Sequence, residues 1–215
     1  MLYLLSAEIQ TGKTSWLVAL VSLLREAGVP VSGVVAPGVW KDHGETASQS
    51  PSGRYEKLGI DNVLLPQGEV VHLARRRDLA IAAKLVEPEG QSERAGLAWS
   101  MSDACLERVN EHLAWLECDE SHGLQTGRSS ARRGLYVVDE LGRLELLRGE
   151  GLTHAVSTLA RGPRSRWPVA LAVVRPTLLC RAHELFDAPW VGRVIEISPG
   201  DDAASSILGE FEPVR

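Results

Sequence analysis

The chain has 215 residues, which is enough for one ordinary α/β domain and too few for two. With 44% hydrophobic and 24% charged residues it can bury a core, which excludes disordered and collagen-like classes. Its 23 Lys and Arg against 28 Asp and Glu give a net charge of -5, which argues against a general nucleic-acid binder and leaves a small anionic ligand open.

Cysteine usage and the N-terminal residues indicate the compartment. Cys105, Cys118 and Cys180 are odd in number and far apart, unlike a disulfide framework or a zinc site, so we expect a reducing environment. The first residues carry no basic segment, and no apolar stretch reaches about 18 residues, the length of a membrane span. The sequence therefore predicts a cytoplasmic protein without a membrane segment.

Short apolar runs alternate with amphipathic stretches along the chain. The runs predict buried parallel strands at residues 2–5, 29–35, 135–138, 169–174 and 194–197. Apolar residues at helical spacing predict helices over 15–27, from 101 onward, over 152–160 and over 177–186. The first of these helices is apolar on almost every side and is expected to be largely buried. The pattern indicates an α/β fold with a mostly parallel sheet of five or more strands.

Two segments interrupt this alternation. Residues 36–73 are rich in glycine and proline and hold β-like pieces at 62–65 and 70–73 around a Pro-Gln-Gly turn, which predicts a β-hairpin insertion at one end of the sheet. Residues 118–134 are polar and longer than an ordinary connection, which predicts a flexible loop. We expect both segments to belong to a single domain that spans residues 1–215.

A phosphate-binding loop is predicted between the first strand and the first helix. The pattern G-x-x-x-x-G-K-[ST] directs backbone N–H groups at a phosphate, with a lysine for the β- and γ-phosphates and a hydroxyl for Mg²⁺. Here it reads Ala7, Glu8, Ile9, Gln10, Thr11, Gly12, Lys13 and Thr14, followed by Ser15, and it departs from the pattern in Ala7. The alternative is an ordinary glycine turn with a surface lysine.

The apolar run at 135–138 ends in two acidic residues. Ligands of parallel sheets bind at the carboxyl ends of the strands, so Asp139 is expected to hold Mg²⁺ through water. Glu140 is expected to orient and deprotonate an attacking water. A strand that simply ends in charged residues is the alternative. Arg143 and Glu145 either form a structural salt bridge or position the loop that follows Glu140.

Other side chains have two interpretations each. Arg175 follows the run at 169–174 and either neutralises γ-phosphate charge or is a solvated surface residue. Arg54 and Lys57 in the insertion either close over the phosphates or are solvated. Trp40 and Trp99 either stack on a base or pack within the hairpin and core.

The two motifs together resemble those of a known family. The loop at residues 7–14 and the segment 137–146, Val-Val-Asp-Glu-Leu-Gly-Arg-Leu-Glu-Leu, are similar to those of the small P-loop nucleoside-triphosphatases, the family of the thermophile and cancer-related nucleoside-triphosphatases. The resemblance extends from Met1 to about Ile197 and is specific at these two motifs. Ala7, the 118–134 segment and the tail from Ser198 depart from it.

The resemblance implies a three-layer P-loop fold of the catalytic-glutamate division. It also implies Mg²⁺-dependent hydrolysis of nucleoside triphosphates, ATP and GTP among them, to diphosphate and phosphate, with broad base tolerance. A second nucleotide-binding segment is then expected, formed by Val137, Val138, Asp139, Glu140, Leu141, Gly142 and Arg143. Catalysis is expected from Glu140, Lys13 and Arg175, and metal binding from Thr14 and Asp139.

Two other functions are compatible with these motifs. A small-molecule or nucleotide kinase would use the same loop with an acceptor other than water, and the arginines of residues 118–134 would then form a lid. The Asp139-Glu140 pair favours hydrolysis over phosphoryl transfer by a kinase. A nucleotide-dependent switch with slow hydrolysis and a protein partner is the third function. No nucleic-acid or membrane partner is expected, and no segment indicates a preferred base.

Overall fold

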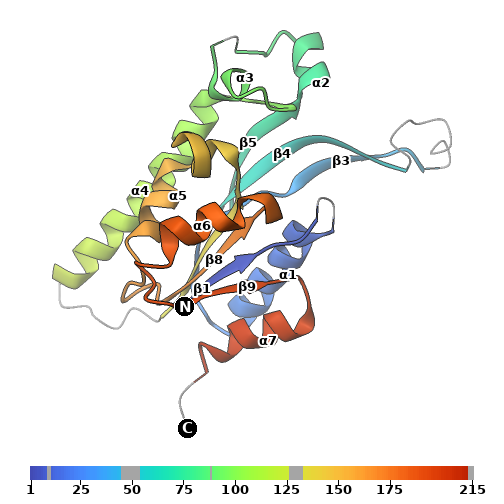
Figure 1. The fold of residues 1–215 in the computed structure, drawn as a ribbon. Helices are drawn as coiled ribbons and strands as arrows, with labels where there is room; N and C mark the ends of the chain where they lie inside the picture. The colour runs from blue at the N-terminus through green and yellow to red at the C-terminus, as the bar shows by residue number, and fades with distance from the viewer. Residues whose placement is uncertain (9–10, 45–53, 88, 126–132, 213–215) are drawn as a thin grey trace.

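The computed structural model describes residues 1–8, 11–44, 54–87, 89–125 and 133–212 (Figure 1). The described strands form one nine-stranded sheet in the order β6-β5-β4-β2-β7-β8-β1-β9, with β3 paired to β4. Helices cover both faces of this sheet, which confirms the predicted α/β class.

The strands predicted from continuous apolar runs form the parallel part of the sheet. They are β2 (Val31–Val35), β7 (Leu135–Leu141), β8 (Val169–Val174), β1 (Leu2–Leu5) and β9 (Val194–Ile197), each parallel to the next. Every residue of β1 and β8 is buried, as an apolar run without alternation predicts for a strand covered on both faces. β2 begins at Val31 rather than at residue 29, and β7 continues to Leu141.

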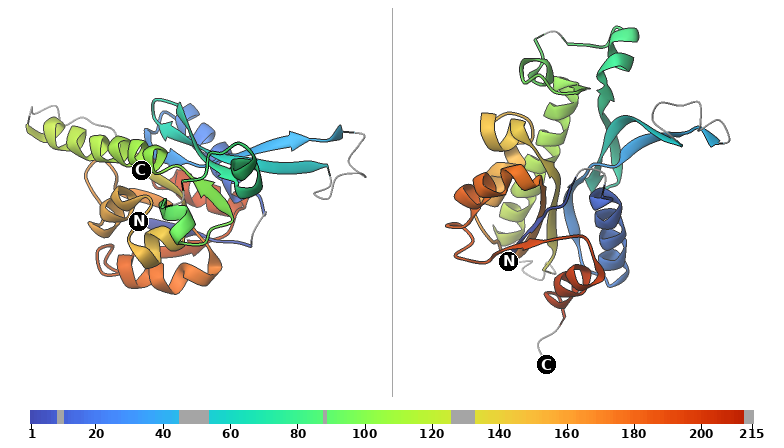
Figure 2. Two further views of the ribbon diagram at one scale, coloured as in Figure 1. Left: turned by 90° about the horizontal axis from the view of Figure 1, so that it is seen from above. Right: turned by 45° about the vertical axis from the view of Figure 1, so that its right-hand side comes forward.

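The remaining strands are antiparallel. They are β3 (Gly38–Asp42), β4 (Tyr55–Leu65), β5 (Glu69–Arg76) and β6 (Trp99–Met101). The predicted β-hairpin is present as β4 and β5, which are longer than predicted, and Figure 2 shows β3 and β4 projecting from the body of the molecule. The expectation of a mostly parallel sheet is wrong: the sheet is mixed, because a tight turn imposes antiparallel pairing and β4 extends the sheet beyond β2.

Alternate residues of β1 face two separate cores. Leu2 and Leu4 belong to one hydrophobic cluster, and Tyr3 and Leu5 belong to another on the opposite face. The first cluster is covered by α4 (Asp103–Gln125), α5 (Thr153–Ala160) and α6 (Leu179–Phe186), and the second by α1 (Lys13–Glu26) and α7 (Asp201–Gly209) (Figures 1 and 2). The shorter elements are α2 (Arg77–Ala82), α3 (Gln91–Arg94), η2 (Leu144–Arg148) and η3 (Pro176–Leu178).

Two expectations about helices are wrong. α1 is buried on one face only: Leu17 and Leu24 lie in the core, whereas Val18 and Leu23 are exposed, because a single face of the helix packs on the sheet. Residues 118–125 are not a loop but continue α4 to Gln125, since this segment contains no proline to end the helix. Residues 126–132, which hold most of the remainder of the predicted loop, lie outside the described residues.

Cys105 and Cys180 are free thiols. Among the helices that the structure describes, none combines the length and the apolar character needed to cross a bilayer.

Gly33 occupies a position in β2 that admits no side chain. Its φ is +121°, and a Cβ atom there would overlap the carbonyl oxygen of Val137 in β7. We predict that Gly33→Ala lowers the free energy of unfolding by at least about 3 kcal/mol, because β2 must move away from β7. Denaturant unfolding followed by circular dichroism measures this loss.

Gly209 provides the matched control for this substitution. It ends α7, and a Cβ atom there would meet nothing within 4 Å. Gly209→Ala is expected to leave stability unchanged or to raise it by less than about 1 kcal/mol. An equal loss in both variants would contradict the role of Gly33.

Candidate functional site

A cavity of about 690 Å³ opens at the edge where the parallel strands end. Open α/β sheets bind their ligands at this edge, because parallel strands present their carboxyl ends on the same side. Segments distant in the sequence meet here: the loop after β1, the start of the insertion, and the ends of β7 and β8. Its principal lining residues are Ala7, Gly12, Lys13, Thr14, Gly38, Trp40, Lys57, Trp99, Asp139, Glu140 and Arg175.

The loop after β1 presents the N-terminus of α1 to this cavity. Gly12 precedes the helix with a φ of +81°, and no side chain caps the first turn, which contains no acidic residue. An uncapped helix N-terminus favours an anion. Lys13 Nζ donates hydrogen bonds of 2.6 Å to the carbonyl oxygens of Ala7 and Glu8, while Ile9 and Gln10 lie outside the described residues.

Asp139 is a buried carboxylate held between three segments. Its Oδ2 accepts a hydrogen bond of 2.9 Å from the backbone N–H of Ala36, just after β2, and its Oδ1 lies 3.5 Å from Thr14 Oγ1. Burial is the main reason why the pKa of Asp139 is raised to about 6; the Ala36 N–H opposes this shift, and the nearby Glu140 charge adds to it. The end of β7 is thereby fixed to the start of α1.

Thr14 and Asp139 fit the donor set of a nucleotide-bound Mg²⁺. The ion prefers oxygen ligands, and it is usually bound by one or two protein groups together with phosphate oxygens and water. Within the described ranges, no three His, Cys, Asp or Glu side chains cluster as a complete metal site, so these residues would bind the ion only together with a ligand. One hydroxyl and one carboxylate beside the uncapped N-terminus of α1 match that requirement.

Glu140 adopts a backbone conformation that is rare for a residue with a side chain. Its φ is +70°, and the pairing of β7 with β8 shifts register between Val138 and Leu141. Left-handed residues and bulges of this kind concentrate at functional sites, where they redirect a side chain. The Glu140 carboxylate accepts a hydrogen bond of 3.0 Å from Arg175 Nη2, so the residue predicted at the end of β8 meets the one predicted at the end of β7.

The loop after Glu140 is fixed by a buried carboxylate. Glu145 accepts hydrogen bonds of 2.8 Å from the N–H of Gly142 and 3.1 Å from the N–H of Leu152. Burial raises the pKa of Glu145 from its ordinary value. Of the two interpretations for Glu145, the structure supports positioning of this loop rather than a salt bridge.

The insertion contributes a cation to the cavity. Lys57 Nζ lies 5.2 Å from the ring centre of Trp99 and 5.9 Å from that of Trp40. Gly38 makes this packing possible, because a Cβ atom there would lie 2.7 Å from Trp40 Nε1 and 2.8 Å from Lys57 Cε. Arg54 is instead paired with Asp42 at 3.3 Å and does not line the cavity.

The other predicted nucleotide-binding residues divide into three groups. Thr11 and Ser15 line the cavity. Val137, Val138 and Leu141 are buried within β7 and do not line it, so they act as the scaffold for the two acidic residues. Gly142 and Arg143 line a smaller neighbouring cavity.

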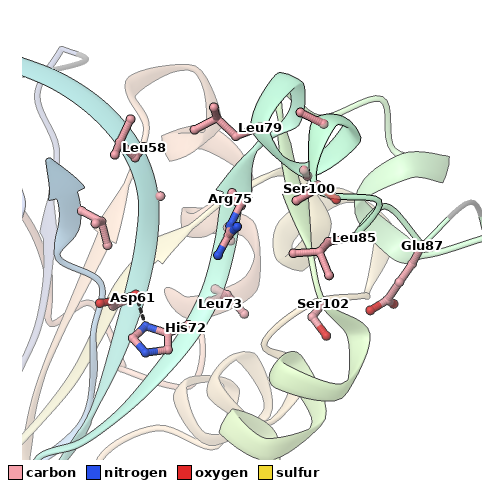
Figure 3. Close-up of a pocket in the computed structure, with 16 residues that line it drawn as sticks. Leu58, Asp61, His72, Leu73, Arg75, Leu79, Leu85, Glu87, Ser100 and Ser102 are labelled. Atoms are coloured by element: carbon pink, nitrogen blue, oxygen red, sulfur yellow. Dashed lines mark hydrogen bonds and ion pairs between the residues drawn. The ribbon is translucent and has the colours of Figure 1, made fainter. Parts of the chain in front are cut away.

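A larger groove of about 900 Å³ lies between β4, β5 and α2 (Figure 3). Its polar lining includes a 2.9 Å contact between His72 Nδ1 and Asp61 Oδ1, and the His72 side chain is 84% exposed. Neither the described residues of the loop after β1 nor the acidic end of β7 lines this groove. It is therefore not the candidate site, despite its size.

Sequence reasoning missed one group and one contact that shape the site. The N–H of Ala36 is a backbone donor and carries no sequence signal. Lys57 and Trp99 are both predicted candidates, but their contact depends on how the insertion folds back, which spacing along the chain does not encode.

Comparison of the chain with protein-family models, with curated proteins and with solved structures finds no match.

Proposed function

We propose that this protein is a Mg²⁺-dependent nucleoside-triphosphatase with a P-loop fold, as the resemblance of its two motifs implies. The observation that carries the proposal is the approach of Thr14 Oγ1 to Asp139 Oδ1 at 3.5 Å across 125 residues of sequence. A hydroxyl after a glycine-lysine pair and a carboxylate at the end of another strand of the sheet are the two protein groups that P-loop enzymes use for Mg²⁺.

The charges around the cavity suit a triphosphate. The N–H groups at the start of α1 and the Lys13 ammonium group would bind the β- and γ-phosphates, with Lys13 leaving the carbonyl oxygens that it contacts in the free protein. Lys57 would approach the γ-phosphate from the opposite wall. Thr14 and Asp139 would hold Mg²⁺, which supplies positive charge to the phosphates when bound.

Glu140 would act on the attacking water. The water oxygen forms a bond to the γ-phosphorus while the bond from that phosphorus to the bridging oxygen breaks, and the water proton passes to the Glu140 carboxylate. Arg175 would orient that carboxylate through its 3.0 Å hydrogen bond and add positive charge near the γ-phosphate. All these contacts reach phosphates, metal or water, and none reaches the base. The proposal therefore extends to ATP, GTP and nucleoside triphosphates with other bases.

The first prediction separates binding from hydrolysis. Lys13→Ala removes the cation of the loop and is expected to abolish nucleotide binding. Glu140→Gln keeps the loop intact and is expected to bind nucleotide while losing on the order of 10²-fold or more in rate, the contribution of a general base. Phosphate release from ATP, GTP, CTP and UTP, together with binding of a fluorescent nucleotide, measures both. Hydrolysis at the wild-type rate by Glu140→Gln would exclude Glu140 from the reaction.

The second prediction concerns the insertion. Lys57→Met is expected to lower phosphate release by on the order of 10²-fold, because the γ-phosphate loses one charged partner in a shielded site. Arg54→Met is the matched control in the same insertion, since Arg54 faces Asp42 and does not line the cavity. Equal rates in the two variants would show that Lys57 takes no part.

The third prediction is a pH dependence of metal binding. The Asp139 pKa of about 6 lies above the ordinary value for aspartate, so the carboxyl is increasingly protonated as the pH falls through that value and protons compete with Mg²⁺. The Mg²⁺ concentration for half-maximal binding, measured with a non-hydrolysable nucleotide by calorimetry, should rise toward about tenfold per pH unit below the pKa. A constant value between about pH 8 and about pH 5 would contradict this role of Asp139.

A further inference from the structure

A second cavity lies beside the nucleotide cavity and shares part of its wall. Its volume of about 330 Å³ is near the lower end of the range for small-molecule sites, roughly 300–1,000 Å³. Both cavities are lined by Ile60, Trp99, Asp139, Glu140 and Arg175. We call this smaller cavity the side chamber. None of the described residues in segment 7–15 lines it. A molecule there contacts the Glu140 end of the site without touching the phosphate loop.

The wall of the side chamber is mainly apolar. Its apolar members beyond the shared wall include Leu73, Leu97, Ala98, Met101, Leu144 and Leu152. Arg143, which is exposed, and the Glu145 carboxylate also line the chamber, and the carboxylate already accepts hydrogen bonds from two backbone N–H groups. Such a wall favours a molecule with an uncharged, apolar body.

Asn62 supplies a hydrogen-bond donor to this apolar wall. The residue is 1% exposed and lines the side chamber from β4. Within the part of the chain that the structure describes, its Nδ2 atom has no hydrogen-bond partner. A buried donor without a partner costs about 1–3 kcal/mol, so natural proteins retain few of them. Because the Nδ2 atom is itself buried, an oxygen atom of a bound molecule would satisfy this donor once the Asn62 amide turns toward the chamber.

We propose that the side chamber binds a phosphoryl acceptor, a small and largely apolar alcohol with a second oxygen for Asn62 Nδ2. This inference rests on the proposed function, because the phosphoryl donor is the nucleoside triphosphate. When the chamber contains only water, water attacks and the reaction is hydrolysis. When the alcohol fills the chamber, its hydroxyl takes the place of that water beside Glu140.

The transfer step uses the groups already placed in the site. The alcohol oxygen forms a bond to the γ-phosphorus as the bond between that phosphorus and the bridging oxygen breaks. The hydroxyl proton passes to the Glu140 carboxylate, and the nucleoside diphosphate leaves with the electron pair of the broken bond. Arg175 contacts both cavities and Glu140, so it is present at the boundary where the two substrates meet.

Binding is tested with 3-methoxybenzyl alcohol, which carries an apolar ring, a hydroxyl and an ether oxygen. Nuclear magnetic resonance follows the side-chain amide of Asn62, identified by its loss in Asn62→Leu, in protein that holds Mg²⁺ and a non-hydrolysable ATP analogue. We expect a saturable shift of this signal. Ala98→Trp, which fills the exposed part of the chamber wall, should abolish the shift, whereas Ala19→Trp on the exposed side of α1 should retain it.

Transfer is tested by ³¹P resonance of the products formed from ATP, Mg²⁺ and the same alcohol. With the wild-type protein, formation of the phosphate ester should saturate as the alcohol concentration rises. The molar ratio of ester to inorganic phosphate should exceed the molar ratio of alcohol to water by at least about tenfold, because a bound hydroxyl acts at a high effective concentration. The ratio of ester to inorganic phosphate should fall by about tenfold or more in Ala98→Trp and stay unchanged in Ala19→Trp.

The possible failures are distinguishable. Phosphate release without ester would overturn the acceptor and leave the proposed function intact, whereas neither product from a protein that binds nucleotide would overturn the proposed function. A full shift of the Asn62 signal by the ATP analogue alone would assign the chamber to the nucleotide and overturn the acceptor site.

Asn62→Leu supplies an independent stability readout. Removing an unpaired donor should raise Tm by about 2–4 °C and weaken binding of the alcohol by at least about threefold. A fall in Tm would show that Asn62 is already paired in the free protein, and would overturn its role as the ligand's donor.

Discussion

The hydrogen bond from the Ala36 N–H to the Asp139 carboxylate is the contact on which the candidate site depends. It joins the end of β7 to the chain just beyond β2, and the other carboxylate oxygen faces Thr14 at the start of α1. Burying a charged carboxyl is unfavourable, and the backbone donor offsets only part of that cost. A cation between Asp139 and Thr14 would offset more, which couples the stability of this corner to its ligand.

Much of the framework was predictable from residue pattern. The five parallel strands follow from apolar runs, and the positions of Lys13, Asp139 and Glu140 at one edge follow from the rule that parallel strands end on the same side. The antiparallel extension was underestimated, because β4 and β5 include polar residues beyond the short apolar pieces. The contact of Lys57 with Trp99 and the burial of Asn62 depend on tertiary folding of the insertion, which local periodicity does not specify.

Three residues that break local rules line the side chamber beside the carboxyl end of β7. Glu140 has a left-handed backbone, Asp139 is a buried carboxylate and Asn62 is an amide donor among apolar neighbours. Each feature alone disfavours the folded state, and the surrounding packed strands hold all three in place. The concentration of such features in one place is typical of a site shaped for a ligand rather than for stability.

The pairing of β1 has a consequence for the order of events during protein synthesis. β1 lies between β8 and β9, and its partners run from Ala170 to Val173 and from Val194 to Ile197. The loop after β1 therefore leaves the ribosome well before both strands that pair with β1, because these strands lie far downstream in the sequence. Contacts so distant in sequence form slowly. A nascent or truncated chain that ends before β8 carries the loop's residues without the scaffold that shapes them.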